Sequence, residues 1–99
     1  MKLIRIVKMT FNPEKVAEFL DFFEGYKLQI RNFEGCVYLQ VLQDQQSPNI
    51  VFSYSHWNQA SDLENYRNST LFKAIWPRTK ELFIEKAEAW STSLVHDLV

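Results

Sequence analysis

The apolar residues of this 99-residue chain follow two different spacings, and segments with one or the other spacing succeed each other along the chain in a definite order. Stretches with apolar side chains at alternate positions are typical of strands, and stretches with them every three or four positions are typical of helices. Four strands are predicted, at residues 2–11, 36–43, 50–57 and 87–95. Two helical segments are predicted between them, from Asn12 to about Asn32 and from Gln59 to about Phe83.

Local signals mark where these segments begin and break. Asn12-Pro13-Glu14 suits a helix start, since it combines a capping side chain, a proline and an acid near the positive end of the helix dipole. Gly35 is free to adopt the positive φ of a turn before the second strand. In the second helical segment, Asn68-Ser69-Thr70 are indifferent helix formers and Pro77 lacks an N–H. We therefore expect this segment to break near both places. Asn58 or Ser61 is the expected cap at the start of the segment.

The order strand, helix, strand, strand, helix, strand predicts a ferredoxin-like βαββαβ domain of the α+β class. Both helices would pack on one face of a four-stranded antiparallel sheet, in a single domain spanning residues 1–99. The other face would still carry apolar side chains with no part of the chain left to cover them. The sequence therefore predicts a homodimer formed through the open sheet face.

Composition and charge exclude several kinds of partner. The formal net charge is −1 and the basic residues are scattered singly, so neither nucleic acid nor an acidic membrane surface is a predicted partner. Charges interrupt the apolar N-terminus and no segment has a bilayer-spanning length, which predicts a cytoplasmic location. Cys36 is the only cysteine and is expected to be a small buried residue. No metal-ligand spacing, nucleophile motif or phosphate loop is present.

The residues that suit chemistry gather in or near the stretch 51–76. His56 is the only imidazole outside the tail and is the candidate base, with Tyr66 as a second catalytic candidate. An aromatic substrate would be held by four rings, those of Tyr54, Phe72, Trp76 and Trp90. Arg67 or Arg78 would stabilise a substrate anion, although arginines are usually solvated. The alternatives are a surface histidine and aromatic core packing, and the sequence does not decide which face of strand 50–57 meets the helices.

Five short motifs, taken in this order, resemble the antibiotic biosynthesis monooxygenase domain. They are Asn12-Pro13-Glu14-Lys15, Phe33-Glu34-Gly35-Cys36, Tyr54-Ser55-His56-Trp57, Leu63-x-x-Tyr66, and Ser69-x-Leu71-Phe72 followed by Trp76. The resemblance spans nearly the whole chain without gaps. It implies a dimeric α+β barrel of two ferredoxin-like subunits joined sheet to sheet, with a small pocket in each subunit between sheet and helices.

Members of that family catalyse several different reactions. They include monooxygenases that act on quinols and polycyclic phenols without metal or flavin, haem-degrading enzymes and an isomerase of a phosphorylated sugar. The haem-degrading branch has an asparagine where this chain has Val7 and a histidine iron ligand where it has Trp76. Many other members have a histidine in place of Tyr66 and a glutamate in place of Ser55. The first two differences disfavour haem degradation, and the other two weaken the comparison with the isomerase and the quinol-oxidising enzymes.

Three functions follow as hypotheses. The first is a monooxygenase that uses no cofactor and acts on a small aromatic quinol or phenol. The second is a dimeric ligand-binding or stress-response protein that does not turn its ligand over. The third is an isomerase of a small phosphorylated compound, which would need cationic side chains converging in the pocket.

Overall fold

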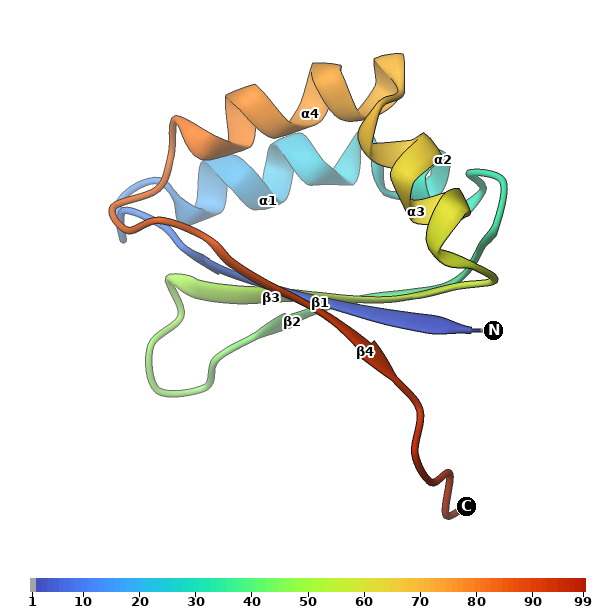
Figure 1. Cartoon of the computed structure of the whole chain (residues 1–99). Helices are drawn as coiled ribbons and strands as arrows, with labels where there is room; N and C mark the ends of the chain where they lie inside the picture. Colours follow the sequence, from blue (N-terminus) through green and yellow to red (C-terminus); the bar gives the residue numbers. More distant parts are fainter. Residues whose placement is uncertain (1) are drawn as a thin grey trace.

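The computed structural model describes residues 2–99 and shows one four-stranded antiparallel sheet with its helices on a single face (Figure 1). The strands are β1 (Leu3–Thr10), β2 (Cys36–Gln43), β3 (Ile50–Trp57) and β4 (Glu88–Ser93). The helices are α1 (Val16–Glu24), α2 (Lys27–Arg31), α3 (Ala60–Arg67) and α4 (Thr70–Lys80). The strand order β2-β3-β1-β4 confirms the predicted ferredoxin-like fold.

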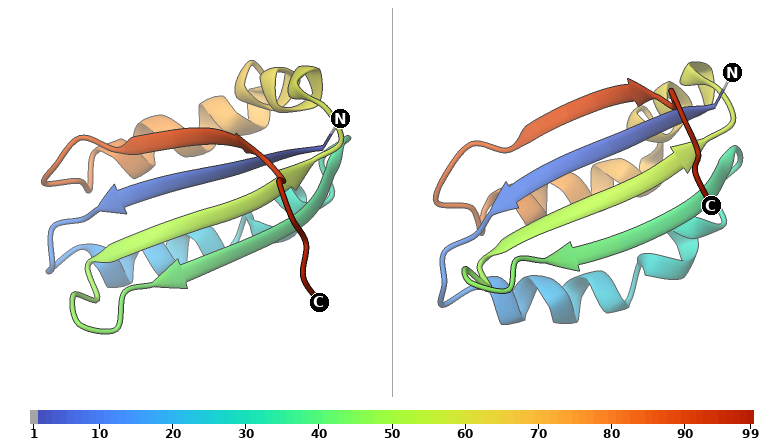
Figure 2. Two further views of the ribbon diagram at one scale, coloured as in Figure 1. Left: turned by 60° about the horizontal axis from the view of Figure 1, so that its bottom comes forward. Right: turned by 90° about the horizontal axis from the view of Figure 1, so that it is seen from below.

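The register of the sheet decides which side chains face the helices. Arg5 lies between Ser55 and Ser91, and the next position on the same face pairs Val7 with Ser53 and Ala89. Because side chains alternate along a strand, the residues between these rows lie on the opposite face. That face, seen from below in Figure 2, has no helix over it. We call it the open face, and its members include Tyr38, Leu42, Phe52, Tyr54, His56, Trp90 and Thr92.

The first helical segment is divided, contrary to the expected continuous helix from Asn12 to about Asn32. Asn12 accepts a hydrogen bond from the backbone N–H of Glu14 through Oδ1, at 3.0 Å, and forms a turn. The regular helix begins only at Val16 and ends at Glu24, and α2 follows after Gly25 and Tyr26. Glycine has the lowest helix propensity after proline, which accounts for the position of the break.

The second helical segment breaks at one of the two predicted places. Ser69 separates α3 from α4 and caps α4, since its Oγ accepts the backbone N–H of Phe72 at 3.1 Å. The expected break at Pro77 is wrong, because Pro77 lies inside α4. The packing of α4 in the helix layer outweighs the one hydrogen bond that the proline cannot donate. Gln59 is the N-cap residue of α3 and no described side chain caps this helix, so the expected capping by Asn58 or Ser61 is also wrong.

The last strand is shorter than expected. β4 covers Glu88–Ser93, whereas the sequence predicted residues 87–95, and the six residues after it have no regular structure. This tail runs from the sheet toward the side of the open face (Figure 1). Its apolar side chains are largely exposed, namely those of Leu94, Val95, Leu98 and Val99.

The core lies between the sheet and the helices in two clusters. The larger cluster surrounds Phe11, which is fully buried, stacks on Phe19 at 4.4 Å and meets Phe83 edge-on at 5.1 Å. The smaller cluster packs around Trp57 and includes Cys36 and Leu63. Within residues 2–99, no helix has the length and apolar character needed to cross a membrane.

Candidate functional site

A cavity of about 350 Å³ lies between the sheet and the helices, where the two core clusters meet. Its floor is made by small side chains on the helix-facing side of the strands, namely Ser53, Ser55 and Ala89. The sheet and the helices pack as two layers around the core. Small residues on one layer therefore leave space that the opposite layer does not fill. The volume falls within the range of small-molecule sites.

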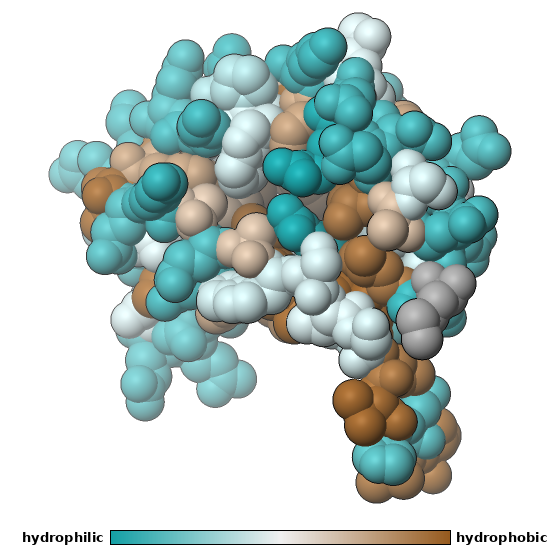
Figure 3. All heavy atoms as spheres, viewed as in Figure 1, coloured by the Kyte–Doolittle hydropathy of each residue, from teal (hydrophilic) through white to brown (hydrophobic). Residues whose placement is uncertain are grey.

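Aromatic side chains from α3 and α4 form the wall opposite this floor. Tyr66 stacks on Trp57 at 5.3 Å between ring centroids and meets Phe72 edge-on at 5.1 Å. Phe72 stacks in turn on Trp76 at 5.8 Å. Figure 3 shows the hollow between the helices and the sheet, where apolar surface is visible among hydrophilic side chains. The shape and chemistry of this cavity suit a planar aromatic ligand.

Tyr66 brings a hydroxyl into this apolar lining. Its ring lies among Phe33, Trp57 and Phe72, so ionisation would place a charge where water is scarce. Burial, and secondarily the nearby Cys36, raise the pKa of Tyr66 well above its ordinary value. The phenol therefore stays protonated at neutral pH and acts toward a ligand as a hydrogen-bond donor or acceptor, not as a base.

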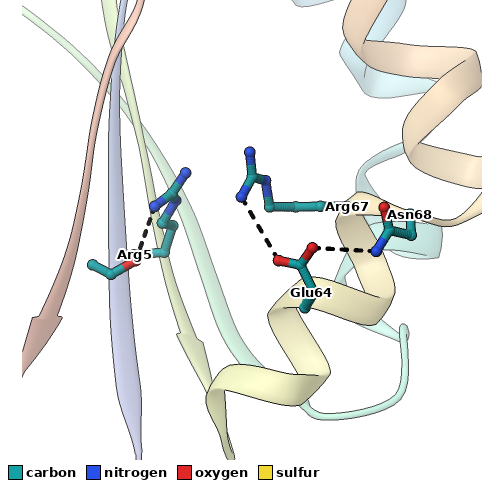
Figure 4. Close-up of polar contacts among 5 residues, drawn as sticks. Arg5, Glu64, Arg67 and Asn68 are labelled. Atoms are coloured by element: carbon teal, nitrogen blue, oxygen red, sulfur yellow. Dashed lines mark hydrogen bonds and ion pairs between the residues drawn. The ribbon is translucent and has the colours of Figure 1, made fainter.

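Two arginines are the charged residues of the lining. Arg5 extends from β1 and donates a hydrogen bond to Ser91 Oγ at 2.8 Å, while Arg67 extends from α3 (Figure 4). The two guanidinium groups point toward one another across the gap between strand and helix (Figure 4). Partial burial first, and the positive charge of Arg67 second, lower the pKa of Arg5. The described residues that line the cavity include no aspartate, glutamate or histidine.

The structure brings together half of the six residues predicted for the site. Tyr66, Phe72 and Trp76 line the cavity. The other three are His56, Tyr54 and Trp90, which lie on the open face of the sheet. The expectation that His56 acts as a base beside Tyr66 therefore needs correction, because the sheet separates the imidazole from the cavity. The same separation removes Tyr54 and Trp90 from the set of residues that would hold a ligand there.

His56 belongs instead to an aromatic cluster on the open face. Its ring centroid lies 4.9 Å from that of Tyr38 and 5.1 Å from that of Tyr54. Desolvation first, and the charge of Lys2 second, lower the pKa of His56, while Asp97 opposes this shift. The imidazole is therefore held toward its neutral form. Its Nε2 is buried and has no hydrogen-bond partner among the described residues.

Reasoning from the sequence missed the residues that create the cavity and its charge. Ser53 and Ser55 alternate with larger side chains on β3, so small size on one parity was the available signal for a cavity floor. Arg5 interrupts an apolar strand, and no role was predicted for it. Arg67 was considered for an anion, and the structure places it in the lining, whereas Arg78 lies over the Phe22 ring at 5.3 Å. Among residues 2–99, no group of three or more His, Cys, Asp or Glu side chains is placed to hold a metal ion.

The sequence matches the model of the antibiotic biosynthesis monooxygenase family over residues 3–78. This range includes β1 to β3 and all of the helices except the last two residues of α4, and therefore most of the cavity. No curated protein matches the chain.

Solved structures share the fold over nearly the whole chain. A conserved protein from Methanosarcina mazei Go1 is 25% identical, with a TM-score of 0.88 over 93% of this chain and 91% of that one. A structure described as antibiotic biosynthesis monooxygenase is 16% identical, with a TM-score of 0.89 over 95% and 99%. Rv0793 from Mycobacterium tuberculosis is 10% identical, with a TM-score of 0.89 over the full length of both chains. At such identities the similarity establishes the fold.

Proposed function

The chain belongs to the antibiotic biosynthesis monooxygenase family, and from that premise we propose that it oxygenates a small aromatic phenol or quinol without a cofactor. The observation that carries the proposal is the apolar cavity, walled by Tyr66, Phe72 and Trp76 and floored by small residues. Its volume of about 350 Å³ accommodates an aromatic compound of one or two rings. The neutral Tyr66 hydroxyl is the polar group in this aromatic wall that orients it.

The proposed reaction is balanced by the substrate and O₂ alone. A phenol and one O₂ give a quinone and one water, so one oxygen atom enters the ring and the other leaves as water. All four electrons that reduce O₂ come from the substrate. The phenolate transfers the first electron to O₂, and the resulting radical and superoxide combine to form the carbon–oxygen bond. Loss of water then leaves the second carbonyl of the quinone.

The protein's part in this reaction is to hold the ring and to exclude water from it. Phe72 and Trp76 stack with their planes 20° apart, and they form an apolar surface for the substrate ring. Tyr66 donates a hydrogen bond to a substrate oxygen, and this bond becomes stronger as negative charge develops on that oxygen. Since the described residues of the lining include no imidazole or carboxylate, the phenolic proton passes to solvent at the mouth of the cavity.

Oxygen uptake tests this proposal directly. We expect a substituted hydroquinone or naphthol to consume O₂ faster with the protein than without it. Tyr66→Phe should lower kcat/KM by about 10²-fold, the usual effect of losing one donor to a developing oxyanion. Tyr26→Phe is the matched control, because Tyr26 contacts Phe22 outside the cavity. Rates equal to the protein-free autoxidation across a panel of such substrates would reject the proposal.

A second candidate is a binding protein that does not turn its ligand over. The absence of any acid or histidine from the described lining favours it, since catalysis then depends on the substrate's own acidity. Such a protein would bind aromatic compounds equally well with or without air and would leave them unchanged. The oxygen-uptake comparison separates the two candidates.

We also propose that the working form is a homodimer joined through the open face. Large apolar side chains are exposed there, with Tyr38 at 40%, Leu42 at 47% and Trp90 at 45% of their full accessibility. Such a contiguous apolar surface is typical of a protein interface.

Sedimentation measures this assembly. We expect a mass of twice 11.8 kDa for the native protein and a shift toward 11.8 kDa for Trp90→Glu, which puts a charge into the proposed interface. Leu28→Glu is the control, because Leu28 is equally apolar and 67% exposed but lies on α2, in the helix layer. A native protein that sediments as a monomer at all concentrations would contradict the proposal.

A further inference from the structure

The two arginines of the cavity differ from the other charged residues of the chain in their surroundings. Arg5 is half-buried on β1, in a row with the small residues Ser55 and Ser91 that leave room for its long side chain. Arg67 reaches the same space from the end of α3, with its side chain 49% exposed. The pair therefore stands where the cavity meets solvent, with the apolar interior behind it.

Two like charges placed together without an acid between them raise the energy of the empty site. Partial burial first, and the positive charge of Arg67 second, lower the pKa of Arg5. A negatively charged group between them would remove the repulsion. Each guanidinium offers five N–H donors in a plane, an arrangement suited to oxyanions.

Glu64 does not fill this role. Its Oε2 lies 3.8 Å from Nη1 of Arg67, beyond hydrogen-bond distance, and its side chain is 63% exposed. Its Oε1 accepts instead from Asn68 Nδ2 at 3.2 Å, on the far side of Arg67 from Arg5 (Figure 4). An exposed pair of this kind contributes little energy. With one glutamate beside two arginines, the mouth of the cavity keeps a positive charge.

We propose that the ligand of this cavity is an aromatic anion whose negatively charged oxygen group lies between Arg5 and Arg67, while its ring enters the apolar interior. The oxygen group is either a carboxylate on the ring or the ionised phenol itself, since both present oxyanion acceptors to guanidinium donors. The inference rests on the proposed function for the location of the site, and it names the class of compound that the site selects. It also makes Arg5 and Arg67 specificity-determining residues.

Calorimetric binding tests the selectivity without requiring turnover. In the carboxylate arm, 2-naphthoate is compared with its methyl ester and its amide, which keep the rings and remove the charge. We expect the anion to bind at least about tenfold more tightly than either neutral compound, as charge-assisted hydrogen bonds allow. In the phenol arm, 4-nitrophenol is titrated on both sides of its own pKa, and its affinity should rise as it ionises. A preference in either arm supports the proposal and identifies the source of the oxyanion.

Variants locate the selectivity. Arg67→Gln and Arg5→Gln should each lower affinity for the preferred anion by about tenfold and leave affinity for the neutral ester unchanged. Arg5→Lys should retain part of the affinity, because it keeps the charge and loses the planar donor array. Arg78→Gln is the control, because this exposed arginine of α4 contacts Phe22 outside the cavity.

Equal binding of anions and neutral analogues by the native protein would overturn this inference, as would anion selectivity that survives both glutamine variants. These outcomes are distinct from failure of the proposed function. Selective anion binding without oxygen uptake would reject the proposed oxygenase and support the arginine site. Oxygen uptake at equal rates on charged and neutral substrates retains the oxygenase and rejects the arginine site.

Discussion

Replacing Gly35 with alanine is expected to lower the free energy of unfolding by about 2–5 kcal/mol, the sum of a backbone and a steric penalty. Gly35 has a φ of 88°, in the left-handed region that other residues avoid. An added Cβ would also overlap the Cβ and Cγ atoms of Asp62, at the start of α3. The backbone O of Gly35 accepts the N–H of Asn58 at 2.9 Å, so this turn holds the end of β3 as well. Urea denaturation measures the loss.

Gly25 provides the matched control for this substitution. Its φ of −75° suits any residue, and an added Cβ would come no closer than 3.5 Å to Phe22 O. Gly25→Ala should therefore leave stability unchanged or raise it by about 0.4–1 kcal/mol, because alanine restricts the unfolded chain. If the two alanine variants unfold at the same urea concentration, the positive φ and close approach at Gly35 are not properties of the folded protein in solution.

Phe11→Ala is expected to cost about 3–5 kcal/mol, the range measured for removing a fully buried phenylalanine ring. Phe11 has no exposed surface and is in contact with both Phe19 and Phe83. Removing its ring leaves a void beside Met9 and Phe19, which also line the ligand cavity. Thermal and urea unfolding measure the effect.

Leu28→Ala serves as the control for the core substitution, because Leu28 is 67% exposed on α2. Its effect should stay within about 0.5 kcal/mol, as is usual for surface positions. Phe11→Leu keeps most of the buried volume and should lose much less than Phe11→Ala. A loss below about 1 kcal/mol for Phe11→Ala would show that the ring is not packed as described.

The architecture was predictable because every element follows its own period and the strands are bounded by turn residues. β2 and β3 have the predicted limits, since Gly35 precedes one and Ser47-Pro48-Asn49 separates the two. The helix breaks were harder to place. Local propensity placed one break correctly at Ser69 and gave another at Pro77 that the structure does not have. Packing of α4 on the sheet outweighs a single unfavourable residue near its end.

The cavity was only partly predictable because the large side chains in the middle of β3 lie on the open face. Phe52 and Tyr54 are larger and more apolar than Ser53 and Ser55, yet the serines face the helices. A ligand cavity needs small side chains where a core would need large ones, and an interface needs large side chains where solvent would favour polar ones. Together they place small side chains on the inward side of this strand and large ones on its outward side, which is the reverse of the usual pattern. Tyr66, Phe72 and Trp76 were found because a helical aromatic stripe faces the sheet in either case.

The alternation along β3 has a consequence for how this protein can change. Neighbouring positions have separate roles, because Ser53 and Ser55 line the cavity whereas Tyr54 and His56 lie on the open face. Ligand preference and self-association can therefore be altered independently by substitutions one residue apart. A slip of the strand by a single residue would exchange the two sets and damage both tasks together. Ligand preference and self-association therefore both depend on the register of β3 with its neighbours, although each can otherwise evolve separately.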